Sequence, residues 1–427
     1  MRGGLVRVLL ISANTETLNM PALPLGLASV AAATQRAGHE VLLVNLMFQE
    51  DAESAIRDSI ERFRPSVIGL SVRNIDDQNM ERPQFLLAPA REVVASCRRF
   101  CSAPIVLGGA GYSIFPDSAL RYLGGDMGIQ GEGEAVFPAL LERMARRAQV
   151  FDLPGVCLPG CAPERRSFAG TLDDLPFPEP RLWIPSVARE SQLWVPVQSR
   201  RGCPMDCSFC STPIIEGRSI RRRSPERVVR WLAELAETGS RNFNFVDNTF
   251  NLPPSYAKEL CRKIIQAGLD INLWCLIYPK WIDPELVELM RRAGCSQISF
   301  GFESGSDRML RSFNKRFNTQ QVRAVSKLFE EAGIERRGFL LLGGPGETKD
   351  SVEESLSFAD SLNLAQLKVT AGLRIYPQTP LARTALAEGV IRPGEDLLSP
   401  RFYVAPELRD WLPERVAQYQ ALRAWVN

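Results

Sequence analysis

Three closely spaced cysteines are the residues in this sequence best suited to redox chemistry. Cys203, Cys207 and Cys210 follow the pattern C-x3-C-x2-C. Three thiolates can bind three irons of a [4Fe-4S] cubane and leave the fourth iron open, and an open position distinguishes catalytic from structural metal sites. Zinc would need a fourth ligand, which neither a local cysteine nor the sole histidine, His39, obviously supplies. The spacing therefore favours a redox-active iron-sulfur cluster.

The other seven cysteines are expected to have structural roles. Cys97 and Cys101, like Cys157 and Cys161, are separated by three residues, but each pair lacks a third nearby partner for a second cluster. The chain shows no secretory signal, so reduced thiols are expected instead of a disulfide framework. Free cysteines in apolar segments behave as small hydrophobic side chains. The cysteines expected to pack in this way are Cys261, Cys275 and Cys295.

Four later segments follow the cysteines in a recognisable order. They are Asn244–Phe250, Gly301–Gly305, Gly343–Thr348 and Tyr376–Pro380. Alone, each is equally typical of an ordinary turn or a capped helix. Together with Phe209 directly before the third cysteine, their order resembles the radical SAM superfamily over residues 195 to 385. The resemblance implies catalytic roles for the three cysteines and S-adenosylmethionine as a cofactor. It implies cofactor-binding roles for Phe209, Asp247, Gly301, Glu303, Ser304, Leu340, Gly346 and Tyr376.

The family pattern also implies how these residues act. The segment around Asp247 would meet the amino group of S-adenosylmethionine, Glu303 its ribose or methionyl end, and the loop containing Gly346 its adenine. The reduced cluster would donate one electron to the sulfonium, and the resulting 5′-deoxyadenosyl radical would abstract a substrate hydrogen. A flavodoxin- or ferredoxin-type protein is the expected electron donor.

Alternating strands and helices position these motifs. After residue 194 the apolar runs predict six parallel strands in βα units, which amounts to a partial (β/α)6 TIM-like barrel over residues 195–390. A short C-terminal tail, 391–427, would follow. The predicted strands are Val195–Gln198, Asn242–Val246, Ile271–Ile277, Gln297–Phe302, Gly338–Leu342 and Val369–Ile375.

Residues 1–150 predict a separate α/β domain with a doubly wound parallel sheet, joined to the barrel by a proline-rich linker at 151–194. In such sheets ligands bind beyond the carboxyl ends of the strands. The predicted strands are Val6–Ser12, Val41–Asn45, Val67–Val72, Ile105–Leu107 and Met127–Gln130.

Short glycine-containing segments of this first domain resemble the cobalamin-binding domain found upstream of one large radical SAM class. They are Pro24–Ala28, Ala37–Val41, Gly108–Gly109 and Gly131–Glu134. A nicotinamide site is the rival interpretation, but the first turn lacks G-x-G-x-x-G, and the glycines are also compatible with tight turns alone. The resemblance implies cobalamin contacts at Ser12, Leu25, Gly26, Ser71, Arg73, Asn74, Gly108, Gly109, Gly131, Glu132 and Gly133.

The lower face of cobalt is expected to lack a protein histidine. The D-x-H-x-x-G motif of many cobalamin proteins is missing, and His39 begins the second strand, away from the ligand edge. Arg73 would line this face, where a permanent cation cannot donate a lone pair to cobalt. Alternatively, Arg73 pairs with Asp76 or Asp77.

Composition limits the partners. The 51 Lys and Arg residues nearly balance the 49 Asp and Glu residues, and no apolar run reaches about 18 residues, so neither nucleic acid nor a membrane span is expected. A cytoplasmic monomer acting on a small molecule or lipid is predicted. The basic run 218–223 favours a solvated face over a site for an acidic electron donor or substrate.

The combined resemblance implies a cobalamin-dependent radical SAM enzyme. Methyl transfer through methylcobalamin to an unactivated carbon or phosphorus is the expected reaction. Cobalamin-dependent reactions without net methylation, such as ring contraction, cyclisation, sulfur or redox chemistry, remain open. A methylthiotransferase or a non-catalytic cobalamin carrier is less well supported.

Overall fold

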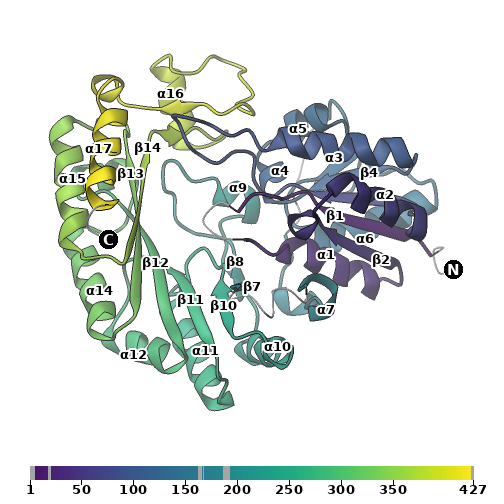
Figure 1. Ribbon diagram of the computed structural model, residues 1–427, viewed down its shortest axis with the longest axis horizontal. Helices are drawn as coiled ribbons and strands as arrows, with labels where there is room; N and C mark the ends of the chain where they lie inside the picture. The colour runs from purple at the N-terminus through teal and green to yellow at the C-terminus, as the bar shows by residue number, and fades with distance from the viewer. Residues whose placement is uncertain (1–4, 18–20, 162–165, 167, 186–192, 425–427) are drawn as a thin grey trace. The chain divides into compact units, whose positions relative to one another are not determined.

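The computed structural model describes residues 5–17, 21–161, 166, 168–185 and 193–424. The chain forms two compact units (Figure 1). The N-terminal unit comprises residues 1–77, 85–196 and 212–223, and the C-terminal unit comprises 78–84, 197–211 and 224–427. The chain therefore passes between the units several times and is not divided by a single cut.

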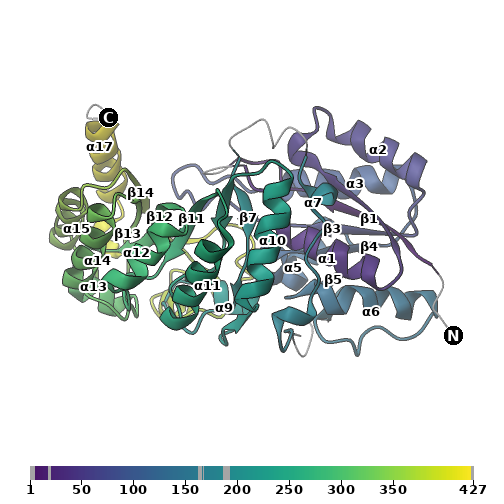
Figure 2. The same ribbon diagram turned by 90° about the horizontal axis from the view of Figure 1, so that it is seen from below.

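The N-terminal unit is built on a six-stranded sheet in the order β2-β1-β3-β4-β5-β6. The strands β1 to β5 pair in parallel, which confirms the predicted doubly wound α/β arrangement. Figure 2 shows α2 and α3 on one face of this sheet and α1 and α6 on the other. The strands are β1 (Arg7–Ser12), β2 (Glu40–Asn45), β3 (Val67–Ser71), β4 (Ile105–Gly108), β5 (Met127–Ile129) and β6 (Val156–Cys157). The helices are α1 (Leu25–Arg36), α2 (Ala52–Phe63), α3 (Leu87–Phe100), α4 (Ala110–Ile114), α5 (Pro116–Leu123) and α6 (Gly133–Ala145).

Apolar strands covered on both faces form the core of this unit. Val8 and Leu10 on β1 pack in one cluster with Leu140 on α6 and Ala31 on α1. All four side chains are at most 1% exposed. Strands of a parallel sheet are buried on both faces, which explains why they appear in the sequence as continuous apolar runs.

The segment predicted as a linker contributes structure to the N-terminal unit. β6 adds an antiparallel strand to the edge of the sheet at β5, and Leu172 and Trp183 are buried. Arg223 donates to the carbonyls of Leu172 and Leu175 at 2.8 and 2.9 Å. These short elements were not predicted from the sequence, because each is too brief to show a periodicity and prolines surround them. Residues 162–165, 167 and 186–192 lie outside the described part. The remaining short elements of this unit are η1 (Leu46–Phe48), η2 (Leu172–Asp174), α7 (Pro180–Trp183), α9 (Thr212–Glu216) and β9 (Arg221–Arg222).

The second sheet contains the six strands predicted for a partial barrel, in the order β14-β13-β12-β11-β10-β7, and the chain enters the C-terminal unit within β7. Neighbouring strands from β10 to β14 pair in parallel. Figure 1 shows α11, α12, α14 and α15 along one face of the curved sheet. The strands are β7 (Val195–Val197), β10 (Asn242–Phe245), β11 (Asn272–Ile277), β12 (Cys295–Glu303), β13 (Glu335–Leu342) and β14 (Gln366–Ala371).

The helices of this unit connect successive strands, and the last residues fold onto it. The segment predicted as a tail contains β16, which pairs with β15, and α17. The helices are α10 (Pro225–Glu237), α11 (Pro254–Ala267), α12 (Pro284–Arg292), α13 (Asp307–Ser312), α14 (Thr319–Glu331), α15 (Lys349–Ser361), α16 (Pro380–Ala387) and α17 (Leu412–Ala424). The short elements are β8 (Arg200–Arg201), β15 (Leu373–Arg374), β16 (Phe402–Tyr403) and η3 (Pro406–Leu408). Within the described ranges, no helix combines the length and the apolar character needed to cross a membrane.

Gly109 offers a direct test of the N-terminal unit. Its φ is +103°, and a Cβ there would lie 2.4 Å from the Val72 carbonyl oxygen. Gly109→Ala should therefore lower the free energy of unfolding by about 2 to 4 kcal/mol. The control is Gly26→Ala, because a Cβ at Gly26 meets no atom within 4 Å. Urea denaturation followed by circular dichroism checks this, and equal stability of the two variants would contradict it.

Candidate active site

The three predicted cluster ligands lie on one loop of the C-terminal unit. Cys203, Cys207 and Cys210 follow β8 and precede Thr212. Cys203 is buried, whereas the other two are half-buried. The backbone N–H of Cys210 donates to the carbonyl of Cys207 at 3.2 Å, which folds the end of the loop into a turn.

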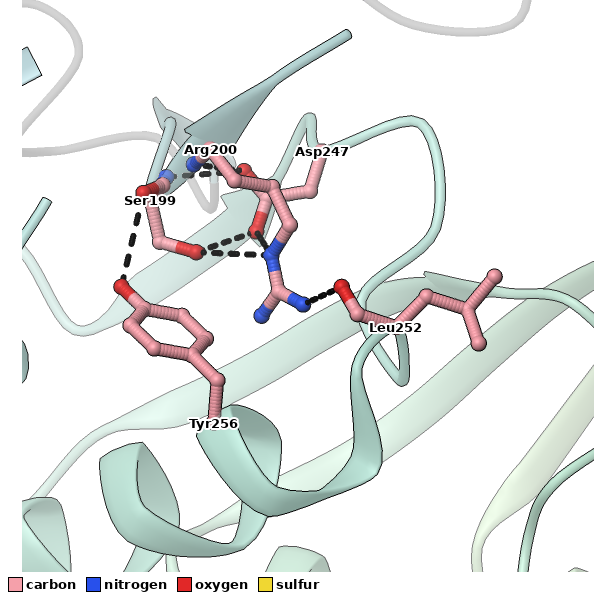
Figure 3. A network of polar contacts seen from close by, with 5 residues as sticks. All are labelled: Ser199, Arg200, Asp247, Leu252 and Tyr256. Atoms are coloured by element: carbon pink, nitrogen blue, oxygen red, sulfur yellow. Dashed lines mark hydrogen bonds and ion pairs between the residues drawn. The ribbon is translucent and has the colours of Figure 1, made fainter. Parts of the chain in front are cut away.

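A buried ion pair fixes the start of this loop (Figure 3). One carboxylate oxygen of Asp247 accepts from the backbone N–H groups of Ser199 and Arg200 at 2.7 and 3.1 Å. The other accepts from Ser199 Oγ at 2.5 Å and from Arg200 Nε at 3.2 Å. The Arg200 guanidinium also donates to the Leu252 carbonyl and lies 4.6 Å from the centroid of the Tyr256 ring. The end of β10 is thereby tied to the residues directly before the cysteines.

This network gives Asp247 a structural role within the chain, and its predicted contact with S-adenosylmethionine stays a prediction. Its side chain is fully buried, and its two oxygens already accept four hydrogen bonds from the chain. Burial raises the pKa of Asp247, while the charge of Arg200 and the hydrogen bonds from Ser199 oppose the rise. Asp247 therefore anchors the cysteine loop.

Glu303, the acid predicted to contact S-adenosylmethionine, lies at the end of β12, where the strand pairing is irregular. The register with β13 shifts between Gly301 and Glu303, and Glu303 has a φ of +62°. A Cβ at Gly301 would lie 2.2 Å from Glu303 Oε1. A side chain at position 301 would therefore displace the Glu303 carboxylate from its present position.

The partner of this acid is Lys315, which was not predicted from the sequence. Its Nζ lies 3.1 Å from Glu303 Oε1, and its side chain is 6% exposed. The same Nζ lies 5.2 Å from the ring centroid of Phe209, which stands between two of the cluster cysteines. Burial alone would lower the pKa of Lys315, but Glu303 and Cys207 outweigh this and raise it. The ammonium is thus held in its charged form beside the cysteine loop.

The thiols themselves are in an environment that disfavours the thiolate. Burial, helped by the neighbouring Cys210 and Cys207, raises the pKa of Cys203 to about 11, although a backbone hydrogen bond at Met205 and the charge of Lys315 oppose the rise. Burial also raises the pKa of Cys207. Among the described residues, no three His, Cys, Asp or Glu side chains are already placed to hold one metal ion. A cubane does not require such convergence, because each thiolate binds a different iron. Its positive iron centres would offset the mutual repulsion of the thiolates, so the donor set fits the cluster.

The segment from Phe313 to Phe317 supports the same loop. The Phe313 carbonyl accepts from the backbone N–H of Ser208 at 3.1 Å, and its ring meets Phe209 edge to face at 5.6 Å. Asn314 Nδ2 donates to the carbonyl of Asp206 at 3.2 Å. The only sequence signal for this segment is a pair of adjacent cations between two phenylalanines, shortly after the G-x-E-S-G motif.

The other residues predicted to bind S-adenosylmethionine are placed mainly by packing. Ser304 is buried, with its Oγ 2.9 Å from Ser355 Oγ. Leu340 is 1% exposed and pairs with Glu303 in the sheet register. Gly346 has a φ of +76° and accepts from Arg308 through its carbonyl. Tyr376 is half-buried at the end of the last strand region.

Glu347 is a buried acid that sequence analysis did not select. Its Oε2 accepts from the backbone N–H groups of Gly343 and Gly344, at 2.5 and 2.9 Å. Its Oε1 is buried without a hydrogen-bond partner in the described part of the chain. Burial raises the pKa of Glu347 to about 7, against the opposing effect of these hydrogen bonds and of Arg308. The carboxyl group holds the G-G-P-G-E-T loop in shape.

In the N-terminal unit, several predicted cobalamin residues gather at the carboxyl edge of the sheet. Ser12, Ser71 and Gly108 each end a strand, and Gly131 follows β5. Leu25 and Gly26 begin α1. A Cβ at Gly26 would meet no atom within 4 Å, and one at Gly108 would meet its nearest at 3.9 Å. The backbone at these two glycines is therefore open to close approach by a ligand, which is compatible with the predicted cobalamin contacts.

Other residues predicted to contact cobalamin at this edge pack against, or hydrogen-bond to, other parts of the chain. Gly109 and Gly133 allow close packing, since a Cβ at Gly133 would lie 2.9 Å from Val30. Glu132 accepts from the backbone N–H of Ala169 at 2.7 Å and pairs with Arg221 at 2.5 Å, and its predicted cofactor contact stays a prediction. Arg221 and Arg223 of the basic run are thus both engaged within this unit.

The lower-face residues lie in the loop after β3. Asn74 Nδ2 donates to Glu16 Oε1 at 3.0 Å. Burial lowers the pKa of Arg73, and the charge of Glu16 opposes this shift. His39 is 8% exposed and precedes β2 at its amino end, where Nδ1 accepts from Val6 at 3.4 Å. Its predicted position away from the carboxyl edge is confirmed.

Comparison with known proteins agrees with both units. Residues 197–359 match the radical SAM superfamily, and residues 11–141 match the B12 binding domain. An uncharacterised methyltransferase of Pyrococcus horikoshii is 26% identical over 86% of the chain and 79% of that protein. The tryptophan 2-C-methyltransferase of Streptomyces laurentii is 24% identical over 88% of the chain and 74% of that protein. The fold resembles the radical S-adenosylmethionine methyltransferase TsrM of Kitasatospora setae, with a TM-score of 0.84 and 22% identity over 97% of the chain and 88% of that protein.

Removal of the Asp247 carboxylate should destabilise the C-terminal unit. Asp247→Ala leaves the Arg200 guanidinium buried without its counter-charge, which costs about 3 to 5 kcal/mol. Urea denaturation measures the loss. Glu288→Ala, which removes an acid from the exposed ion pair with Arg291, should leave the stability near that of the wild type. An Asp247→Ala protein as stable as this control would rule out the anchoring role.

Glu347 should make stability depend on pH near neutrality. Its folded pKa of about 7 lies above the ordinary value of 4.5, so the folded state binds the proton more tightly than the unfolded state. Stability should fall as pH rises between these values, by about 3 kcal/mol in total. Unfolding at pH 5 and pH 8 should show this loss in the wild type and in Glu354→Gln, an exposed acid on the following helix, but not in Glu347→Gln. Equal pH dependence in all three proteins would contradict the assignment.

Proposed function

Because the chain belongs to the radical SAM superfamily and carries a B12-binding domain, we propose that it is a cobalamin-dependent methyltransferase. Its acceptor would be an unactivated carbon or phosphorus atom of a small molecule or lipid. The observation that carries the proposal is the presence, in one chain, of a three-cysteine loop anchored by buried charges and a parallel sheet with open glycine backbone at its carboxyl edge. The relatives named as methyltransferases support the choice of reaction.

The residues that would hold the cofactors follow from the site. Cys203, Cys207 and Cys210 would bind the [4Fe-4S] cluster, and the carboxyl edge at Ser12, Ser71 and its neighbours would bind cobalamin. When bound, the cluster, S-adenosylmethionine and cobalamin supply one-electron cleavage and a transferable methyl group.

The chain's own side chains prepare this chemistry. Asp247 and Arg200 fix the backbone where the cysteine loop begins, so that the thiols are presented from a rigid base. Glu303 and Lys315 place a buried ion pair beside Phe209. Such preorganised charges act strongly because water is excluded from the site.

The expected partners are a protein electron donor and a small substrate. A flavodoxin- or ferredoxin-type protein would supply electrons, and the enzyme would work as a cytoplasmic monomer. The near balance of charge supports a small molecule or lipid as substrate over nucleic acid.

Product mass tests the proposed function. The protein, loaded anaerobically with iron, sulfide and cobalamin, is incubated with a reductant, methyl-deuterated S-adenosylmethionine and a panel of small metabolites and lipids. One product should gain one labelled methyl group. The triple variant Cys203→Ala/Cys207→Ala/Cys210→Ala should lose cluster iron and turnover, whereas Cys161→Ala, an exposed cysteine, should retain both. A product without added methyl would favour cobalamin chemistry without net methylation, and wild-type iron in the triple variant would overturn the cluster assignment.

A further inference from the structure

The buried ammonium of Lys315 has more hydrogen-bonding capacity than the protein uses. A lysine carries three N–H donors, and among the described residues Lys315 hydrogen-bonds Glu303 Oε1 at 3.1 Å and the side chain of Cys207. Its side chain is only 6% exposed. Burial of a charge with unused donors is costly unless a further acceptor is present. The position therefore points to an additional anionic partner.

The remaining contacts of Lys315 show where that partner lies. Its Nζ is 5.2 Å from the ring centroid of Phe209 and 5.8 Å from that of Phe317. Aromatic faces attract a cation but do not replace a strong acceptor. Because Phe209 lies between Cys207 and Cys210 in the sequence, the ammonium is held against the part of the loop that carries the thiols. A side-chain hydrogen bond between Lys315 and Cys207 agrees with this position.

We propose that Lys315 is a positioning residue for the cluster, whose ammonium balances the charge of the cysteine ligands, chiefly at Cys207, and stabilises the reduced cluster. This inference rests on the proposed function, because it requires the cluster on the three cysteines. A nearby cation lowers the energy of the state with one more electron, and the potentials of iron-sulfur clusters depend on local charge and on hydrogen bonds to sulfur.

Glu303 allows a test of the direction in which nearby charge shifts the reduction potential of the cluster. Its carboxylate lies 3.1 Å from the Lys315 ammonium and carries the opposite charge, so its effect on the cluster should have the opposite sign. Loss of the lysine should make the cluster harder to reduce, whereas loss of the acid should make it easier to reduce. A residue that merely filled space would not produce opposite shifts.

The midpoint potential of the cluster, measured by redox titration with paramagnetic resonance detection in the absence of S-adenosylmethionine, decides the matter. Lys315→Met should lower the midpoint potential by at least about 59 mV. For one electron, this corresponds to a tenfold decrease in the equilibrium constant for reduction. Glu303→Gln should raise it, and the double variant should lie between the two. Lys280→Met removes a lysine that bonds to the Arg316 carbonyl and lies 5.1 Å from the Trp281 ring, so it should keep a potential near that of the wild type.

Folding defects do not obscure the result. Lys315→Met leaves Glu303 buried without a partner, but the double variant removes both charges. If the single variant does not load iron, the comparison of Glu303→Gln with the double variant isolates Lys315, and the double variant should have the lower potential. The proposal is overturned if these two potentials coincide, or if Lys315→Met matches Lys280→Met while only the affinity for S-adenosylmethionine changes. A wild-type protein that binds no cluster would instead refute the proposed function.

Discussion

Burial of three thiols on one loop is the constraint on which this part of the C-terminal unit depends. Burial, together with the neighbouring Cys210 and Cys207, raises the pKa of Cys203 to about 11, so ionisation of the three cysteines is favoured only when positive charge is close. Cluster iron would supply most of that charge. Lys315 is a buried protein cation beside the loop, and the exposed Arg316 also contacts it. The loop must keep its shape while the thiols lose their protons, and buried polar contacts fix its start.

The two ion pairs near the loop differ in what they contact. The oxygens of Asp247 accept four hydrogen bonds from Ser199 and Arg200, although one Arg200 nitrogen, Nη2, is buried without a partner in the described part of the chain. Lys315, in contrast, hydrogen-bonds both Glu303 and the side chain of Cys207. The first pair holds the backbone before the cysteines and is therefore suited to anchoring the loop. The second contacts a predicted cluster ligand and is suited to acting on what the loop binds.

The sequence was sufficient for those features that local pattern determines. Cysteine spacing and apolar runs predicted the loop and the strands, because ligand spacing and buried parallel strands leave direct marks on the sequence. The roles of Asp247 and Glu132 were not predictable, since their partners lie 47 to 48 residues away for Asp247 and 37 to 89 residues away for Glu132. Lys315 was missed for the same reason, because only the fold brings it to Glu303.

The claim that the cysteine loop binds a cluster with one open iron is tested most directly by Mössbauer spectroscopy of protein loaded with iron-57. The account predicts a cubane in which one iron differs from the other three, and a change in the parameters of that iron alone when S-adenosylmethionine is added. Four irons that do not respond to S-adenosylmethionine, or a site with a different iron content, would contradict it.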